Sequence, residues 1–411
     1  MATVKPFQCV RPTADLAERV AALPYDVYNR KEAKAEVQRE PLSFLKIDRA
    51  ETGFDDSVDT YAPEVYQRAK ELLQKEIQEG IYVKDRDSAY YVYELVMNGR
   101  SQTGLVACAA VDDYVNNVIK KHENTRADKE VDRITHVDTC NAQTGPIFLA
   151  YRSEQRINEV IAKAQKESPC YDFTAVDGII HRVWKISDRS DVETIQDAFQ
   201  NIQQIYIADG HHRAASAVKV GLKRREQNPN HQGTEEYNYF LSVLFPHDQL
   251  MIMDYNRTVK DLNGYSKEEF FELVKKNFDM EEKGEPVKPE EKGTFGMYVD
   301  HQWYKLTAKS SLYEGKDAVG SLDVSVLQDY LLGPVLGIGD PRTDSRIDFV
   351  GGIRGLQELE KRANEDMKIS FSMYPTSITE LFDVADQNLL MPPKSTWFEP
   401  KLRSGLFIHE I

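Results

Sequence analysis

Hydrophobic residues recur with helical and strand spacing in turn along most of the chain. Residues 61–80 place apolar side chains at the spacing of one helix face and end in a glycine, a typical helix stop. Residues 89–111 contain two β-rich runs joined by an Asn-Gly pair, which is a strong hairpin signal. Strand-like runs lead into helical patterns over 145–167 and again over 181–201. These patterns predict mixed helix and strand in the first two-thirds of the chain.

The same mixture continues toward the C-terminus. We expect strands at 237–245 and 249–254, and Ser266 with Glu269 forms the capping-box pattern of a helix start. Residues 284–296 are rich in proline, glycine and charge, and they predict a loop. The irregular order of the two element types favours the α+β class, with a mixed sheet and packed helices.

The length of the chain favours more than one domain. A chain of 411 residues exceeds what a single hydrophobic core usually serves. We expect a larger α+β domain over 1–260, a smaller α+β domain over 261–390 and a docking tail over 391–411. Within that tail, residues 392–397 combine a cation, two hydroxyls and an aromatic ring, and they could close a pocket.

Charge and cysteine content narrow the function classes. The formal net charge is −15, from 67 acidic and 52 basic residues, and such a surface repels nucleic acid unless a local basic patch is present. No apolar run is long enough to span a bilayer, and the N-terminus lacks the apolar core of a signal peptide. The four cysteines are dispersed, as free thiols in a reducing compartment are. We therefore expect a cytoplasmic protein without a membrane partner. The sequence leaves the oligomeric state open, and a homo-oligomer is one of the options.

The densest polar cluster lies where an apolar run meets a helical pattern. Residues 205–208 are followed by Asp209, Gly210, His211, His212 and Arg213, in that order. A strand that turns through glycine into a helix leaves backbone N–H groups free to bind an anion. Histidine and arginine side chains add donors, and the planar guanidinium suits phosphate. The pattern predicts a phosphate-binding turn, against the alternative of a capped helix start with a core histidine.

A second polar cluster precedes it in the chain. Lys121, His122, Glu123, Thr125 and Arg133 supply a base, a carboxylate, a hydroxyl and cations within a short stretch. That mixture suits deprotonation of a substrate hydroxyl and neutralisation of a phosphoryl group in transfer. A solvated charged loop is the alternative reading.

A third segment, Pro24–Val27, predicts only a turn. Its Asp26 is placed to cap a helix that begins near Arg30.

The turn and several other segments resemble known families. The D-G-H-H-R turn resembles the phosphate-binding turn of the ParB/sulfiredoxin-like superfamily, and that of archaeal free-serine kinases in particular. The chain as a whole resembles the uncharacterised DUF1015 family. The segments that carry this wider resemblance are LPYDVYNRKEA (23–33), KKHENTRADKEVDRITH (120–136), TGPIFLAYR (144–152), the turn itself and the tail that starts at Met391.

The resemblance implies a ParB/sulfiredoxin-like core in the N-terminal part and phosphoryl chemistry on a small hydroxylated metabolite. It names L-serine or O-phosphoserine as substrate, ATP or ADP as co-substrate and Mg²⁺ as the bridging ion. Asp209 would then be a metal ligand or hydroxyl partner, and Glu123 or His122 the general base.

The other residues would bind phosphate or substrate, namely Gly210, His211, His212, Arg213, Thr125, Arg133 and Lys121. A phosphoserine phosphatase-like hydrolase, a ParB-like DNA-binding protein and a nucleotide sensor are the alternatives.

Overall fold

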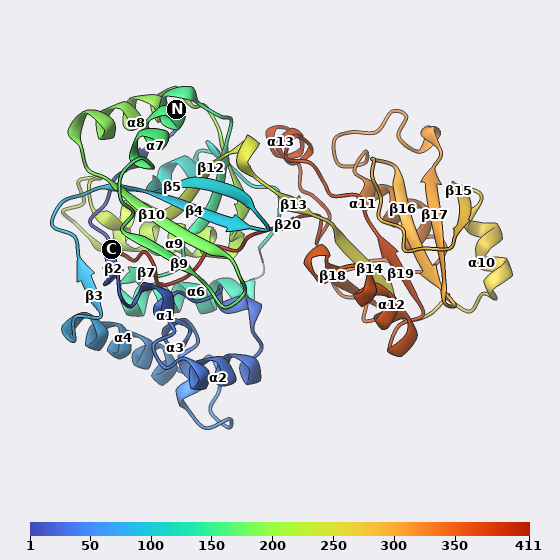
Figure 1. Ribbon diagram of the computed structural model, residues 1–411, viewed down its shortest axis with the longest axis horizontal. Coiled ribbons are helices and arrows are strands. Elements are labelled where there is room, and N and C mark those ends of the chain that lie inside the picture. The colour runs from blue at the N-terminus through green and yellow to red at the C-terminus, as the bar shows by residue number, and fades with distance from the viewer. Residues whose placement is uncertain (126) are drawn as a thin grey trace. The chain divides into compact units, whose positions relative to one another are not determined.

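Two compact units make up the computed structural model of the chain (Figure 1). The first comprises Met1–Leu250 together with Pro400–Ile411, and the second comprises Met251–Glu399. The structure describes residues 1–125 and 127–411, except for the side chain of Asp128. Both units contain helices and strands in irregular order, which confirms the α+β class.

A mixed sheet of nine strands forms the centre of the first unit, in the order β6-β11-β8-β12-β5-β4-β10-β9, with β1 beside β5. Strand β11 pairs in parallel with β6, β12 pairs in parallel with β8, and the other neighbours are antiparallel. Asn98 and Gly99 adopt positive φ between β4 and β5, which confirms the predicted hairpin. The strands are β1 (Val4–Lys5), β4 (Tyr90–Met97), β5 (Arg100–Ala110), β6 (Ile119–Lys120), β8 (Ile147–Tyr151), β9 (Tyr171–Thr174), β10 (Ile180–Ile186), β11 (Ile205–Asp209) and β12 (Tyr239–Pro246).

Helices cover this sheet. Helices α7 and α8 pack on each other, and α9 lies against β8, β12 and α6 (Figure 1). Helix α4 is the helix predicted at 61–80, and it packs on α3 and α6. The helices are α1 (Ala17–Val20), α2 (Arg30–Arg39), α3 (Leu45–Asp48), α4 (Pro63–Gln78), α5 (Val111–Val115), α6 (Ala127–Cys140), α7 (Gln155–Ala164), α8 (Arg189–Asn201) and α9 (His211–Gln227). Short strands β2 (Val10–Pro12) and β3 (Tyr82–Lys84) pair, as do β7 (Ala142–Gln143) and β21 (His409–Glu410).

Two apolar clusters among the described residues stabilise the first unit. The larger lies between the sheet and its helices, where Leu149, Phe199 and Ala214 are fully buried. The smaller joins the N-terminal helices through Phe44 and Leu73. Each fully buried Leu or Phe side chain contributes roughly 1.5–3 kcal/mol. The larger core therefore holds β11 and α9, and the turn between them, in a fixed place.

The second unit is built on an antiparallel sheet of six strands, in the order β15-β17-β16-β19-β14-β18. The capping box of Ser266 and Glu269 starts α10, as predicted. The strand expected at 249–254 is wrong in extent, because only β13 forms there and β14 follows directly. The elements are β13 (Ile252–Met253), β14 (Tyr255–Val259), α10 (Lys267–Val274), β15 (Phe278–Lys283), β16 (Thr294–Val299), β17 (Gln302–Ala308), α11 (Asp323–Leu327), β18 (Ile347–Gly351), α12 (Leu356–Glu365), β19 (Ile369–Ser372), α13 (Ile378–Asp386) and β20 (Trp397–Phe398).

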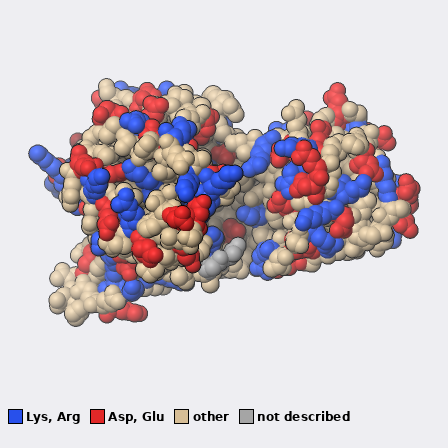
Figure 2. Space-filling model, turned by 90° about the horizontal axis from the view of Figure 1, so that it is seen from below, with Lys and Arg blue, Asp and Glu red and all other residues tan. Residues whose placement is uncertain are grey.

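Two surface properties bear on function. Among the described residues, no helix combines the length and apolar character needed to cross a bilayer. Acidic and basic side chains are interspersed on the face drawn in Figure 2. A mixed distribution of this kind does not supply the continuous basic track that a nucleic-acid backbone requires on that face.

Candidate functional site

The turn between β11 and α9 depends on Gly210. This residue has φ +90°, in the left-handed region where a side chain is strained. A Cβ atom at this position would also lie 3.1 Å from Nε and Nη2 of Arg213. The Arg213 side chain therefore folds back over the glycine backbone, and a small residue is required beneath it.

Arg213 is half-buried, and a backbone carbonyl orients its guanidinium group. Its Nη1 donates a hydrogen bond of 2.5 Å to the carbonyl of Pro146. The carbonyl does not neutralise the guanidinium, but the Asp209 carboxylate interacts with the same charge, so a bound anion would share Arg213 with that carboxylate. The geometry is consistent with the phosphate-binding role that the sequence predicts.

Asp209 is held at the end of β11 by two donors. Its Oδ1 accepts the Gly210 N–H at 2.8 Å, and its Oδ2 accepts from Lys401 Nζ at 3.1 Å. Burial opposes ionisation, but the charges of Lys401 and Arg213 and these two hydrogen bonds outweigh it, so the pKa of Asp209 falls well below its usual range. Both carboxylate oxygens of this predicted metal ligand are already engaged.

His122 and Glu123 lie beside the turn. Strands β6 and β11 are parallel neighbours, so the loop after β6 and the turn after β11 emerge at one edge of the sheet. The rings of His122 and His211 meet edge to face, with centroids 4.5 Å apart, and His211 Nδ1 lies 3.8 Å from Glu123 Oε2. The structure therefore brings three of the sequence-predicted residues together.

Other predicted residues point elsewhere. Lys121 is exposed and lies over the ring of Tyr114, with 4.7 Å from Nζ to the centroid. Thr125 donates to Glu130 within the start of α6. His212 is half-buried and lies near Glu130. Burial raises the pKa of Glu130, but hydrogen bonds from Lys219 and Thr125 and the charge of His212 outweigh it, so the net pKa is lowered. None of these three side chains lines a described cavity.

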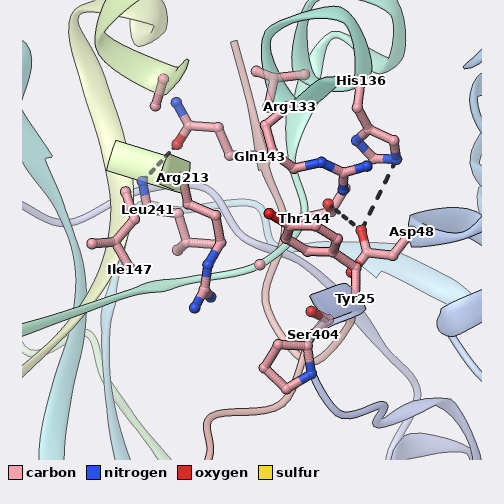
Figure 3. Close-up of a pocket in the computed structure, with 14 residues that line it drawn as sticks. Tyr25, Asp48, Arg133, His136, Gln143, Thr144, Ile147, Arg213, Leu241 and Ser404 are labelled. Carbon is pink, nitrogen blue, oxygen red and sulfur yellow. Dashed lines mark hydrogen bonds and ion pairs between the residues drawn. The ribbon is translucent and has the colours of Figure 1, made fainter. Parts of the chain in front are cut away.

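Arg133 and Arg213 line the same cavity, which we call the first cavity. Its volume is about 30 Å³, and it lies between the sheet, α6, α9 and the C-terminal segment (Figure 3). A second cavity of about 310 Å³ shares Arg133 and three further lining residues with it. The polar residues of the first cavity are Tyr25, Asp48, Arg133, His136, Gln143, Thr144, Arg213 and Ser404.

Asp48 is the carboxylate of the first cavity. Its Oδ1 accepts from Thr144 Oγ1 at 2.9 Å, and His136 Nε2 lies 4.0 Å away from the same oxygen (Figure 3). Burial and the charge of Arg133 lower the pKa of His136, so the ring is neutral at neutral pH. A neutral histidine beside a carboxyl group can position a hydroxyl group and accept its proton.

Arg133 is fixed from two directions. Its guanidinium stacks on the ring of Tyr25, 3.9 Å from the centroid, and its Nε donates to Asp132 Oδ2 at 2.9 Å. Tyr66 donates to the other oxygen of Asp132 at 2.9 Å. Burial raises the pKa of Tyr25 to about 12, so this ring presents a neutral hydroxyl. The stack and the two hydrogen bonds to Asp132 orient the guanidinium at the wall between the two cavities, where its charge is paired with the Asp132 carboxylate.

The role expected for Asp26 is wrong. The helix after it is capped by Asn29, whose side chain accepts from the Glu32 N–H in a complete capping box. Asp26 instead lies in a short 3-10 turn with Tyr25 and lines the second cavity. The sequence analysis therefore identified the right segment but assigned the helix cap to the wrong residue within it.

Sequence reasoning missed Asp48, His136 and Thr144. Two of them lie in segments that carry the family resemblance, 120–136 and 144–152, and these segments meet Tyr25 and the turn at the first cavity. Asp48 lies outside those segments, at the end of α3. Its sequence signal is weak, because the α3 turn reads Leu45-Lys46-Ile47-Asp48 and a charged residue at the end of a helical turn is common.

Comparisons with known proteins identify the family and little else. No curated protein matches the chain. A free serine kinase in complex with AMP matches with 14% identity and a TM-score of 0.35, over 73% of this chain and 91% of that one. SbnI with C-terminal truncation from Staphylococcus aureus matches with 11% identity and a TM-score of 0.38, over 72% and 85%.

A conserved hypothetical protein from Pyrococcus furiosus matches with 15% identity and a TM-score of 0.34, over 74% of this chain and 94% of that one. Similarities this low carry no argument about function. The family model described as "Protein of unknown function (DUF1015)" matches residues 4–325. The chain therefore belongs to the DUF1015 family.

Proposed function

We propose that the first unit is a phosphotransferase that holds the phosphate groups of a nucleotide in the first cavity. The observation that carries this proposal is the convergence of Arg213 and Arg133 on one cavity with the carboxylate of Asp48. Two guanidinium groups in a half-enclosed site suit a polyanion, because each can donate two parallel hydrogen bonds to phosphate oxygens. The backbone N–H groups that follow Gly210 add donors at the start of α9.

The reaction is transfer of a phosphoryl group to a small alcohol. The alcohol oxygen attacks phosphorus, an O–P bond forms, and the P–O bond to the departing nucleotide breaks. The alcohol proton passes to a cavity carboxylate, for which Asp48 is the candidate. Glu123 and His122, the bases suggested by the sequence, lie outside the residues that line the first cavity. Arg213 and Arg133 would stabilise the charge that develops on the transferred group.

The substrates follow from the resemblance of the Asp209–Arg213 turn to that of free-serine kinases. L-serine is the first acceptor to test, with ATP or ADP as donor. Water in place of serine would make the same site a phosphoserine phosphatase-like hydrolase, and binding without turnover would make it a nucleotide sensor.

Magnesium does not fit Asp209 in this arrangement. Its two oxygens already accept hydrogen bonds from Gly210 and Lys401. The titratable groups that its charge acts on include the rings of His122 and His211, whose nitrogen atoms Mg²⁺ does not prefer. We derive no step through a magnesium ion at this residue.

The test is binding and turnover by variants of the purified chain. Isothermal titration calorimetry with ADP, and ³¹P NMR with ATP or ADP plus L-serine, measure the two. We expect Arg213→Ala to weaken ADP binding by about 10-fold or more, since one charged hydrogen-bond pair is lost. Arg213→Lys keeps the positive charge but loses the planar guanidinium with its paired donors, so this variant should recover only part of the ADP affinity.

Arg182→Ala is the matched control. Arg182 is a surface arginine on β10 that pairs with Glu94 and Asp172. The Arg182→Ala variant should bind ADP with the same affinity as the unaltered chain. Equal ADP affinity in Arg213→Ala and Arg182→Ala, with both variants folded by circular dichroism, would refute the phosphate site.

A further inference from the structure

His122, Glu123 and His211 form a cluster separate from the first cavity. One ligand atom from each residue lies within 4.8 Å of the other two. The parallel pairing of β6 with β11 produces the cluster, because it brings residues 122–123 and the first residue of α9 to one edge of the sheet. None of the three side chains lines the described cavities.

Two ring nitrogens in this cluster are buried without a partner. His122 is 2% exposed and His211 is 6% exposed. Neither Nδ1 of His122 nor Nε2 of His211 has a hydrogen-bond partner among the described residues. A buried polar atom left unsatisfied costs roughly 1–3 kcal/mol. Two such atoms on neighbouring rings at one site point to a ligand that supplies the missing bonds.

A hydrogen bond from the His122 ring to the backbone determines which ring nitrogen is free to bind a ligand. The ring hydrogen-bonds the backbone at Ile207, and Nδ1 is the unpartnered nitrogen, so Nε2 makes that bond. A metal-binding histidine typically donates one N–H to a backbone carbonyl and binds the ion with the other nitrogen.

We propose that His122, Glu123 and His211 bind a divalent transition-metal ion of the zinc type. Two histidines and one carboxylate are a common three-residue set for zinc, and they leave the fourth position for water or a substrate oxygen. The nitrogen ligands discriminate against Mg²⁺ and Ca²⁺. This site does not depend on the proposed phosphotransferase activity.

The ligand atoms must move closer when the ion binds. In a tetrahedral zinc site neighbouring ligand atoms lie roughly 3.3 Å apart, given metal–ligand bonds of about 2.0–2.1 Å. Glu123 has a side chain that is 44% exposed and lies on a loop, so it is the residue that can close this gap. The two buried rings supply the fixed half of the site.

The test is metal binding by the full chain after treatment with a chelator. Co²⁺ is the spectroscopic probe and Zn²⁺ competes with it. We expect one equivalent of Co²⁺ with visible absorption bands of a four-coordinate ion, displaced by one equivalent of Zn²⁺. His122→Asn and His211→Asn should each weaken Co²⁺ binding by more than about 100-fold, and Glu123→Gln by about 10-fold or more.

His231→Ala is the matched control, because His231 contacts Tyr237 and Glu235 on another loop and should leave Co²⁺ binding unchanged. Glu123→Gln alters an exposed side chain and keeps the test valid if either histidine variant misfolds. The proposal is overturned if the stripped chain takes up no Co²⁺ or Zn²⁺ at micromolar concentration. It is equally overturned if Glu123→Gln binds as the unaltered chain does, or if Mg²⁺ displaces Co²⁺ at equal concentration.

Discussion

The guanidinium of Arg213 lies directly over the backbone of Gly210, where an added Cβ would be 3.1 Å from its Nε. One glycine thus serves two purposes: it supplies the left-handed backbone that ends β11, and it leaves room for the cation. The position of Arg213 in the first cavity depends on both.

Gly210→Ala should therefore lower both stability and anion binding. The positive φ costs roughly 1–2 kcal/mol for a residue with a Cβ, and the displaced Arg213 should weaken ADP binding by about 10-fold. Urea unfolding and calorimetry measure the two effects. Gly80→Ala provides the comparison, because Gly80 has φ +77° with no atom within 4 Å of its ideal Cβ. That variant should lose stability and bind ADP normally; equal loss of binding in both would contradict the explanation.

Asp48→Asn should separate binding from turnover. The amide keeps the size of the side chain and can still accept from Thr144, but it cannot take a proton from the substrate hydroxyl. We expect kcat to fall by about 100-fold or more, with little change in KM. The ³¹P NMR assay measures this, with Asp191→Asn as a control on α8 that removes the ion pair to Lys163 and lies outside the first cavity. A kcat within about three-fold of the unaltered chain would remove Asp48 from the mechanism.

Acid should destabilise the first unit through His181. This ring is fully buried, hydrogen-bonds Tyr93 at 2.8 Å and accepts from Arg403 Nε at 3.3 Å. Burial, together with the charge of Arg403, lowers the pKa of His181 from 6.5 to about 3. Between these values the unfolded chain binds a proton that the folded chain does not, so stability falls as the pH falls.

The size of this effect can be measured by urea unfolding at about pH 7.5 and about pH 5. One such group contributes roughly 1.4 kcal/mol per pH unit below 6.5. His181→Gln should have a shallower pH dependence of the unfolding free energy by that amount. It should match the unaltered chain in slope above pH 6.5. Parallel curves for the two proteins at all pH values would rule out His181 as the titrating group.

Nucleic acid should bind weakly and without specificity, if it binds at all. The net charge of −15 and the mixed charges on the face drawn in Figure 2 oppose contact with a phosphate backbone. Fluorescence anisotropy with labelled DNA across a salt series measures this. Tight binding at physiological salt that weakens steeply as salt rises would favour the ParB-like alternative instead.

Local patterns predicted elements better than they predicted the site. The Asn98-Gly99 hairpin and the Ser266 cap are confirmed because both signals act over a few neighbouring residues. The role of Asp26 was wrong, since Asn29 competes for the same cap and forms a full capping box with Glu32. Local signals predict that a turn or a helix cap is present. They do not decide which of two nearby residues, such as Asp26 and Asn29, forms the cap.

Pairing of distant segments accounts for what the sequence could not predict. The turn at Gly210 was found from its own residues, but the contact of His211 with His122 requires β6 to lie parallel to β11. Asp48 enters the first cavity because α3 packs on α4, which in turn packs on α6. The spacing of residues along the sequence does not predict which distant segments pack against one another.

The first unit is discontinuous in the chain, and this affects how it is made. Synthesis proceeds from the N-terminus and domains generally fold as they emerge. Lys401, which binds Asp209, and Ser404, which lines the first cavity, are translated only after the whole of Met251–Glu399. A nascent chain therefore holds the Asp209 carboxylate without its lysine partner until Lys401 is translated, and the second unit is synthesised before Ser404 completes the wall of the first cavity.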